Sequence, residues 1–187
     1  MLKDRYGLDL STNSSVARDL YIEAVDAVLS ATGDAEALLK KGIEADPEFA
    51  LNHAVYARVH QLSGRMAEAK AAGEKGVALA QKATDREKQH AQIFQLLTSG
   101  QGPKGLKLIQ SHVQQHQLDA FALAPACSVF GLIGFSGRID REEEQVSLLK
   151  PLQKVYGDDW WFLTVYGFAL VEIGEWKRGR DMVERAL

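Results

Sequence analysis

Histidine is the residue type in this chain that most invites a metal-binding interpretation. Two of its five histidines, His112 and His116, are four residues apart, a spacing that places both imidazoles on one face of a helix. A metal site needs further ligands, and the neighbouring side chains are Gln, Lys and Leu rather than carboxylates or thiolates. His53 and His60 are seven residues apart, and we assign them to packing positions of a helical repeat. The sequence therefore predicts no metal and no cofactor.

Catalytic groups are also missing from the sequence pattern. Cys127 could act as a nucleophile only beside a base, and residues 125–129 offer none, so a buried free thiol is expected. The acidic run at 141–144 opens a helix, where carboxylates favour the positive end of the helix dipole. No phosphate loop, dinucleotide fingerprint or Gly-x-Ser-x-Gly elbow is present. We expect a protein without enzymatic activity.

The composition narrows the classes of partner and compartment. The 187 residues are 46 % hydrophobic and 25 % charged, as in a globular protein, and the formal net charge is −3, which gives no basic face for nucleic acid. No apolar run approaches the roughly 20 residues that span a bilayer, and no signal-peptide core is evident. A single cysteine excludes an intrachain disulfide. We expect a cytoplasmic protein that binds neither nucleic acid nor membranes.

The stretch 51–80 predicts two amphipathic helices joined at Ser63 and Gly64. Its small residues Ala57, Gly64, Ala69 and Gly76 follow one another at seven, five and seven residues. A tetratricopeptide repeat requires this pattern, because its two antiparallel helices approach closely only at small side chains and its turn needs a residue that tolerates positive φ.

Glycines repeat this turn along the chain. Gly64, Gly100, Gly137 and Gly174 are separated by 36, 37 and 37 residues, close to the period of about 34 of this repeat class. They predict an all-α fold without β-sheet, a right-handed α-α superhelix of about five antiparallel helix pairs. The expected organisation is an N-terminal extended arm, 1–13, and a helical-repeat domain, 14–187, with pairs at about 14–47, 48–82, 84–117, 119–157 and 158–187.

Helix boundaries are predicted from capping residues. The expected N-caps are Ser14 or Ser15, Asp34, Thr84 or Asp85, Asp119, Asp140, and Asp158 or Asp159. Pro125 lies inside the seventh helical pattern, where it removes a donor and clashes with the preceding turn. We expect a kink there, or a late helix start near Ala124.

The chain resembles the N-terminal part of the tetratricopeptide repeat protein 38 family. The segment Tyr6–Ser14 is similar to that family's start, a Gly-x-x-Leu-Ser-Thr-x-Ser segment. Ala45-Asp46-Pro47 with His53-Ala54, and Arg86-Glu87-x2-His90, are similar to its first repeats. The resemblance implies a helical-repeat fold without catalytic residues, and family members longer than this chain.

A surface groove is the expected place of function in such an array. The first helices of the pairs would line it, with these residues: Arg58, Gln61, His90, Phe94, Cys127, Gly131, Trp161, Thr164 and Phe168. The row changes from polar to apolar and aromatic along the chain, which favours a protein or peptide partner that presents an apolar helix or extended segment. The alternative is a self-associating module, in which the rest of a longer solenoid or a second copy covers the groove.

The last helical pattern leaves apolar residues without a following helix. Met182, Val183 and Leu187 form an expected self-association face, which would join two copies as a homodimer through the C-terminal helix. We interpret the array as cut off rather than finished, because natural arrays end in a helix with a polar outer side.

Overall fold

The computed structural model describes residues 1–187 and divides into two compact units, 1–108 and 109–187. The first unit holds β1 (Leu2–Lys3), β2 (Asp9–Leu10), α1 (Ser15–Leu29), α2 (Ala35–Ala45), α3 (Ala50–Leu62), α4 (Met66–Ala80), α5 (Asp85–Thr98) and the start of α6 (Gly102–Gln115). The second holds the rest of α6, α7 (Ala120–Leu123), η1 (Ala124–Ala126), η2 (Gly134–Ser136), α8 (Arg141–Leu149), η3 (Lys150–Leu152), α9 (Gln153–Tyr156), α10 (Trp160–Glu172) and α11 (Trp176–Ala186). None of these helices combines the length and apolar character that crossing a membrane requires.

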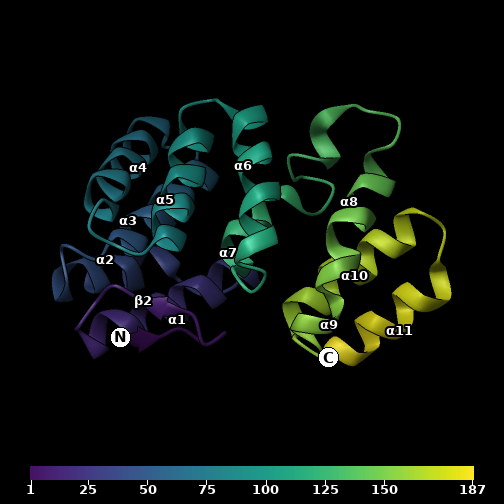
Figure 1. Cartoon of the computed structure of the whole chain (residues 1–187), viewed down its shortest axis with the longest axis horizontal. Helices are drawn as coiled ribbons and strands as arrows, with labels where there is room; N and C mark the ends of the chain where they lie inside the picture. Colours follow the sequence, from purple (N-terminus) through teal and green to yellow (C-terminus); the bar gives the residue numbers. More distant parts are fainter. The chain divides into compact units, whose positions relative to one another are not determined.

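Helices in the first unit pack as consecutive antiparallel pairs. Helix α1 packs on α2 and α3 on α4, while α5 contacts both α3 and α4 (Figure 1). Fully buried apolar side chains, Leu39, Phe49, Leu51, Val55 and Ile93, fill the space between them. In the second unit, α10 packs on α11 and also contacts α8. The predicted all-α helical-repeat class is confirmed.

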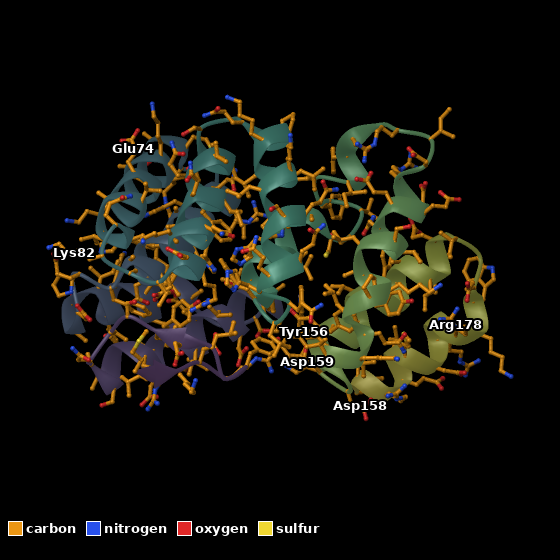
Figure 2. All side chains as sticks on the ribbon, in the orientation of Figure 1. Glu74, Lys82, Tyr156, Asp158, Asp159 and Arg178 are labelled. Atoms are coloured by element: carbon orange, nitrogen blue, oxygen red, sulfur yellow. The ribbon has the colours of Figure 1, made fainter.

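Helix ends follow the predicted capping and turn residues. Side chains of Ser14, Asp34, Thr84, Asp119 and Asp159 each accept a hydrogen bond from a backbone N–H of the first helical turn. Figure 2 shows Asp159 where α10 begins. Asp140 lies at the N-cap of α8 without such a bond. Each predicted turn glycine, Gly64, Gly100, Gly137 and Gly174, has φ between 70° and 86°.

Close contacts between paired helices occur at the same two places around Gly174 and Gly64. Gly167 and Gly179 lie seven residues before and five after Gly174, and a Cβ added to either would lie 2.8 Å or less from the other's carbonyl oxygen. Ala57 and Ala69 occupy the same places around Gly64 and are fully buried. Small residues at these two places therefore let the paired helices touch.

The unit around Gly137 breaks this pattern. Its corresponding places hold Phe130 and Glu142, and no long helix precedes the glycine. Helix α7 ends after Leu123, and Pro125 lies in a short 3-10 helix. The Pro125 carbonyl accepts a hydrogen bond from the Leu132 N–H at 2.8 Å. The expectation of a kinked or late-starting seventh helix is wrong. The helix begins directly after its predicted cap, Asp119, and ends after one turn, because Pro125 has no N–H to donate to the preceding turn.

The N-terminal arm is folded as a hairpin. Leu2 pairs with Leu10 and Lys3 with Asp9, and Asp4 Oδ1 accepts from the backbone N–H groups of residues 6 and 8 at 2.9 Å each. The expectations of an extended arm and of no β-sheet are therefore corrected. The local cause is the aspartate side chain, which bonds to the backbone of its own turn.

A buried carboxylate joins this arm to α5. Glu87 is fully buried and accepts from Ser11 N at 2.9 Å, from the Ser11 hydroxyl, and from Thr84 N at 3.2 Å and Oγ1 at 2.9 Å. Arg86 Nη2 donates to the Asp9 carbonyl at 2.7 Å. Two segments that are distant in the sequence are thereby tied at the N-terminus of one helix.

Replacing Gly76 by Leu should destabilise the protein by about 1–3 kcal/mol through overpacking. A Cβ at this α4 position would already lie 3.3 Å from the Ala54 nitrogen and 3.4 Å from the Ala50 oxygen of α3. Denaturant unfolding measures the loss. Ala78→Leu, at an exposed position of the same helix, is the matched control and should change the free energy of unfolding by less than about 0.5 kcal/mol. Equal effects of the two changes would contradict the close contact.

Candidate functional site

Arg58 and Gln61 are one helical turn apart on α3, and a hydrogen bond joins their side chains. Arg58 Nη1 donates to Gln61 Oε1 at 2.6 Å, and Gln61 Nε2 donates to the Leu97 carbonyl of α5 at 3.1 Å. The guanidinium is partly buried, and no carboxylate lies within ion-pair distance of it. Burial lowers the pKa of Arg58 below its usual value. The structure thus holds a cation partly withdrawn from water without a counter-charge.

The other first-unit groove residues, His90 and Phe94, are both fully buried. Their rings contact each other on α5, with centroids 5.2 Å apart. The expectation that they line an open surface is corrected, because they belong to the packed interior. Arg58 and Gln61 remain from the predicted polar half of the groove.

The aromatic half of the predicted groove lies on α10 in the second unit. Trp161 is 4 % exposed and its ring lies 6.0 Å from that of Tyr156, so it is a core residue rather than a surface anchor. Thr164 is exposed and donates to the Trp160 carbonyl at 2.8 Å, while Phe168 is partly buried. Only Thr164 of these three predicted residues offers an open surface, so this part of the groove is corrected as well.

Two residues of the predicted self-association face pack within the second unit. Met182 is 6 % exposed, and Val183 is partly buried with its Cγ2 against Gly167 of α10. Leu187 and Trp176 are exposed. Figure 2 shows Arg178 on the same helix, α11. Of the three residues of the predicted face only Leu187 is exposed, and the role of this face in self-association stays a prediction.

The histidine pair serves packing around a helix start. His112 Nε2 lies 3.2 Å from Asp119 Oδ2, and both side chains are buried. Asp119 Oδ1 accepts from the Ala122 N–H and caps α7, while the His116 ring lies 4.9 Å from that of His112. No group of three or more His, Cys, Asp or Glu residues is placed to hold a metal ion.

Two shallow hollows remain outside the predicted residues. One, of ≈ 360 Å³ in the first unit, lies between the turn after α1 and the end of α3, where Leu62 is 60 % exposed. The other, of ≈ 380 Å³ in the second unit, lies between α6 and the end of α8. The sequence reasoning missed the second, although its glutamines, Gln110, Gln114 and Gln117, recur at helical spacing and could have been found by that pattern.

Truncation of Trp161 to Ala should cost about 3–5 kcal/mol of stability, because it empties a core position. Thermal unfolding should show a sharp drop in Tm. Trp176→Ala provides the matched control, since that side chain is 68 % exposed and its loss should leave Tm nearly unchanged. If the Trp161→Ala variant is as stable as the parent, the Trp161 side chain is exposed and does not belong to the core.

Cys127 should be inert toward thiol reagents at pH 8 in the folded protein. Its thiol is 3 % exposed, lies 3.6 Å from the Leu123 carbonyl, and burial raises its pKa to about 12. Because the thiolate is the reactive form, labelling should appear only after denaturation. Rapid reaction of the native protein with an aromatic disulfide reagent would contradict this burial.

Comparisons with known proteins identify no family for this chain. No protein-family model and no curated protein matches it, so the resemblance to the tetratricopeptide repeat protein 38 family is not confirmed. Among solved structures it is similar to YrrB, described as a TPR protein with an unusual peptide-binding site. That similarity has 16 % identity and a TM-score of 0.44, and it covers 91 % of this chain and 82 % of the other. The helical-repeat class therefore rests on the helix packing described above.

Proposed function

We propose that this chain is a non-enzymatic helical-repeat scaffold that binds a protein or peptide partner through an acidic residue at Arg58. The single observation that supports it is the guanidinium described above, which bonds only to a neutral carboxamide. Placing a cation in a partly buried site without a counter-charge costs free energy, and an incoming carboxylate would offset that cost.

The other arginines of the chain support this proposal by contrast. Those with a carboxylate partner are Arg5, Arg18, Arg65, Arg138, Arg141, Arg178, Arg180 and Arg185. Arg86 donates to a backbone carbonyl. A guanidinium carries five N–H donors in a planar fork that matches a carboxylate, and Arg58 uses one of them in its hydrogen bond to Gln61. We infer that its remaining N–H groups donate to a side-chain or terminal carboxylate of the partner.

Replacing Arg58 by Met tests this role, because Met keeps an unbranched apolar stem and removes the charge. The probe is a fluorescein-labelled, end-blocked peptide of alternating glutamate and leucine, followed by anisotropy. Arg58→Met should weaken binding at least about tenfold, since a charge-assisted hydrogen bond contributes roughly 1.5–3 kcal/mol. The free energy of unfolding should stay within about 0.5 kcal/mol of the parent or rise, because the change removes an uncompensated charge.

Arg178→Met is the matched control, because Arg178 is exposed and already paired with Glu175. It should leave the anisotropy titration unchanged. The proposal is overturned if Arg58→Met binds the probe as tightly as the parent, or if a glutamine-for-glutamate version of the peptide binds equally well. A large loss of stability in Arg58→Met would instead assign Arg58 to the structure.

A further inference from the structure

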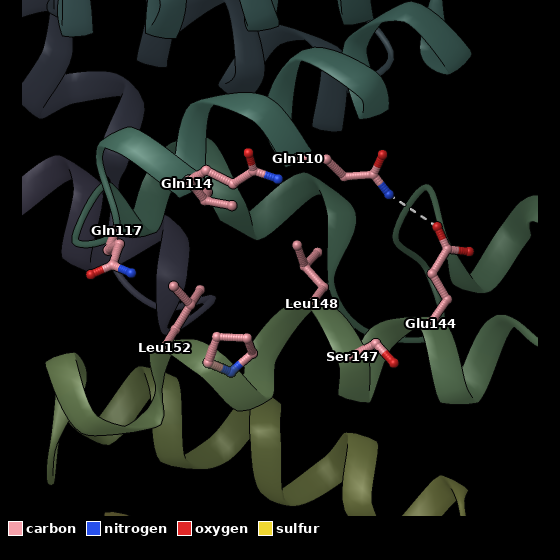
Figure 3. Close-up of a pocket in the computed structure, with 9 residues that line it drawn as sticks. Gln110, Gln114, Gln117, Glu144, Ser147, Leu148 and Leu152 are labelled. Carbon is pink, nitrogen blue, oxygen red and sulfur yellow. Dashed lines mark hydrogen bonds between the residues drawn. The ribbon is translucent and has the colours of Figure 1, made fainter.

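The hollow between α6 and α8 has two chemically different walls. On the α6 side lie three carboxamides, Gln110, Gln114 and Gln117. The opposite wall, at the end of α8 and in η3, is apolar and includes Leu148, Pro151 and Leu152 (Figure 3). Its ≈ 380 Å³ lies in the lower part of the range of about 300–1,000 Å³ typical of ligand sites.

Most polar groups of this hollow are left available. The side-chain carboxamides of Gln114 and Gln117 and the Ser147 hydroxyl make no hydrogen bond within the chain. Gln110 donates one N–H to Glu144 Oε1 at 3.0 Å, which Figure 3 shows as a dashed line. A carboxamide has two donor hydrogens and an acceptor oxygen, so each of these glutamines can still both donate and accept.

The apolar wall adds a backbone acceptor. Pro151 has no N–H, and the carbonyl of Ser147, four residues earlier, therefore lacks its helical donor. The last ordinary helical bond before it runs from the Lys150 N–H to the Val146 carbonyl. Donors and acceptors thus occur on both sides of a space whose remaining surface is apolar.

The spacing of the carboxamides matches an extended backbone. From Gln110 to Gln114 the helix rises about 6 Å, at 1.5 Å per residue. Two residues of an extended chain, at about 3.3 Å each, cover nearly the same length. These two carboxamides can therefore bond to N–H or C=O groups about two residues apart in such a segment, and Gln117 adds a third carboxamide from the turn after α6.

We propose that this hollow binds a short, uncharged, extended peptide segment. The three glutamines of the hollow pair with its backbone, and one aliphatic side chain of the segment rests on Leu148 and Pro151. Glu144 is the one ionisable residue of the lining, and Gln110 and Arg138 already bond to it. A charged residue at the centre of the ligand would lose its water without gaining a counter-charge, so the site favours neutral sequences.

This site is separate from the one proposed at Arg58. It lies in the other unit and is built for a neutral ligand, whereas Arg58 calls for a carboxylate. It also lies between the second helices of two consecutive pairs, not on the first helices where the sequence placed a groove. Failure of either proposal therefore leaves the other standing.

The experiment uses the intact ¹⁵N-labelled chain and an end-blocked pentapeptide with a central leucine flanked by threonines, which favour extended backbone. Side-chain amide signals are followed by NMR during the titration. We expect the signals of Gln114 and Gln117 to shift, with a Kd of about 1 mM or tighter. The double change Gln114→Ala and Gln117→Ala should weaken binding about tenfold or more, since it removes two or more hydrogen bonds.

Gln115→Ala is the matched control, an exposed glutamine of the same helix that does not line the hollow. It and Arg58→Met should leave the titration unchanged, while a central aspartate in the peptide should weaken binding about tenfold. Circular dichroism verifies that the double variant keeps its helices. The proposal is overturned if the glutamine signals stay still, if Gln115→Ala weakens binding as much as the double variant, or if the aspartate peptide binds equally well.

Discussion

The buried carboxylate of Glu87 is the interaction on which the first half of the chain depends. A buried carboxyl group is tolerated only when hydrogen bonds replace its water, and Ser11 and Thr84 supply them through both backbone and hydroxyl donors. Thr12, in the same segment, also contacts the end of α2, where its hydroxyl donates to Asp46 Oδ2 at 2.5 Å. One short segment therefore joins three helices: it precedes α1, contacts the end of α2 and anchors the start of α5. Removing the carboxylate would take the acceptor from four donors at once, two of Ser11 and two of Thr84, which costs more than the loss of one bond.

The sequence could predict the helices because their ends are marked by local chemistry. Ser14, Asp34 and Thr84 cap helices through their own side chains, and the turn glycines adopt a backbone that other residues resist. Periodicity could not separate a groove from a core, however. A helix inside an array is contacted on more than one side, so Phe94 and Trp161 show the expected spacing and are nevertheless buried. Arg58 stays a groove candidate, but its missing counter-charge is a three-dimensional property that no spacing reveals.

Both candidate sites arise where the repeat stops satisfying its own polar groups. On α3, the neighbours of Arg58 within the unit provide a carboxamide and a carbonyl but no anion. In the second unit, the irregular segment after α7 gives way to α8, and Pro151 ends the regular hydrogen bonding of that helix. The hollow opens beside this interruption. The chemistry that a partner could recognise is therefore an unpaired cation within a regular repeat at Arg58, and an interruption of the repeat at the hollow.

The backbone contact between Gly167 and Gly179 requires a fixed number of residues in the turn between α10 and α11. Gly167 lies seven residues before Gly174 and Gly179 five residues after it, so their contact depends on this number as much as on the small size of both residues. One residue inserted in that turn would rotate the following helix by about 100° and carry Gly179 away from its partner. The Gly64 turn sets the same count for Ala57 and Ala69. Short surface loops usually tolerate insertions. These turns must keep their length, because otherwise the paired helices would lose their contact.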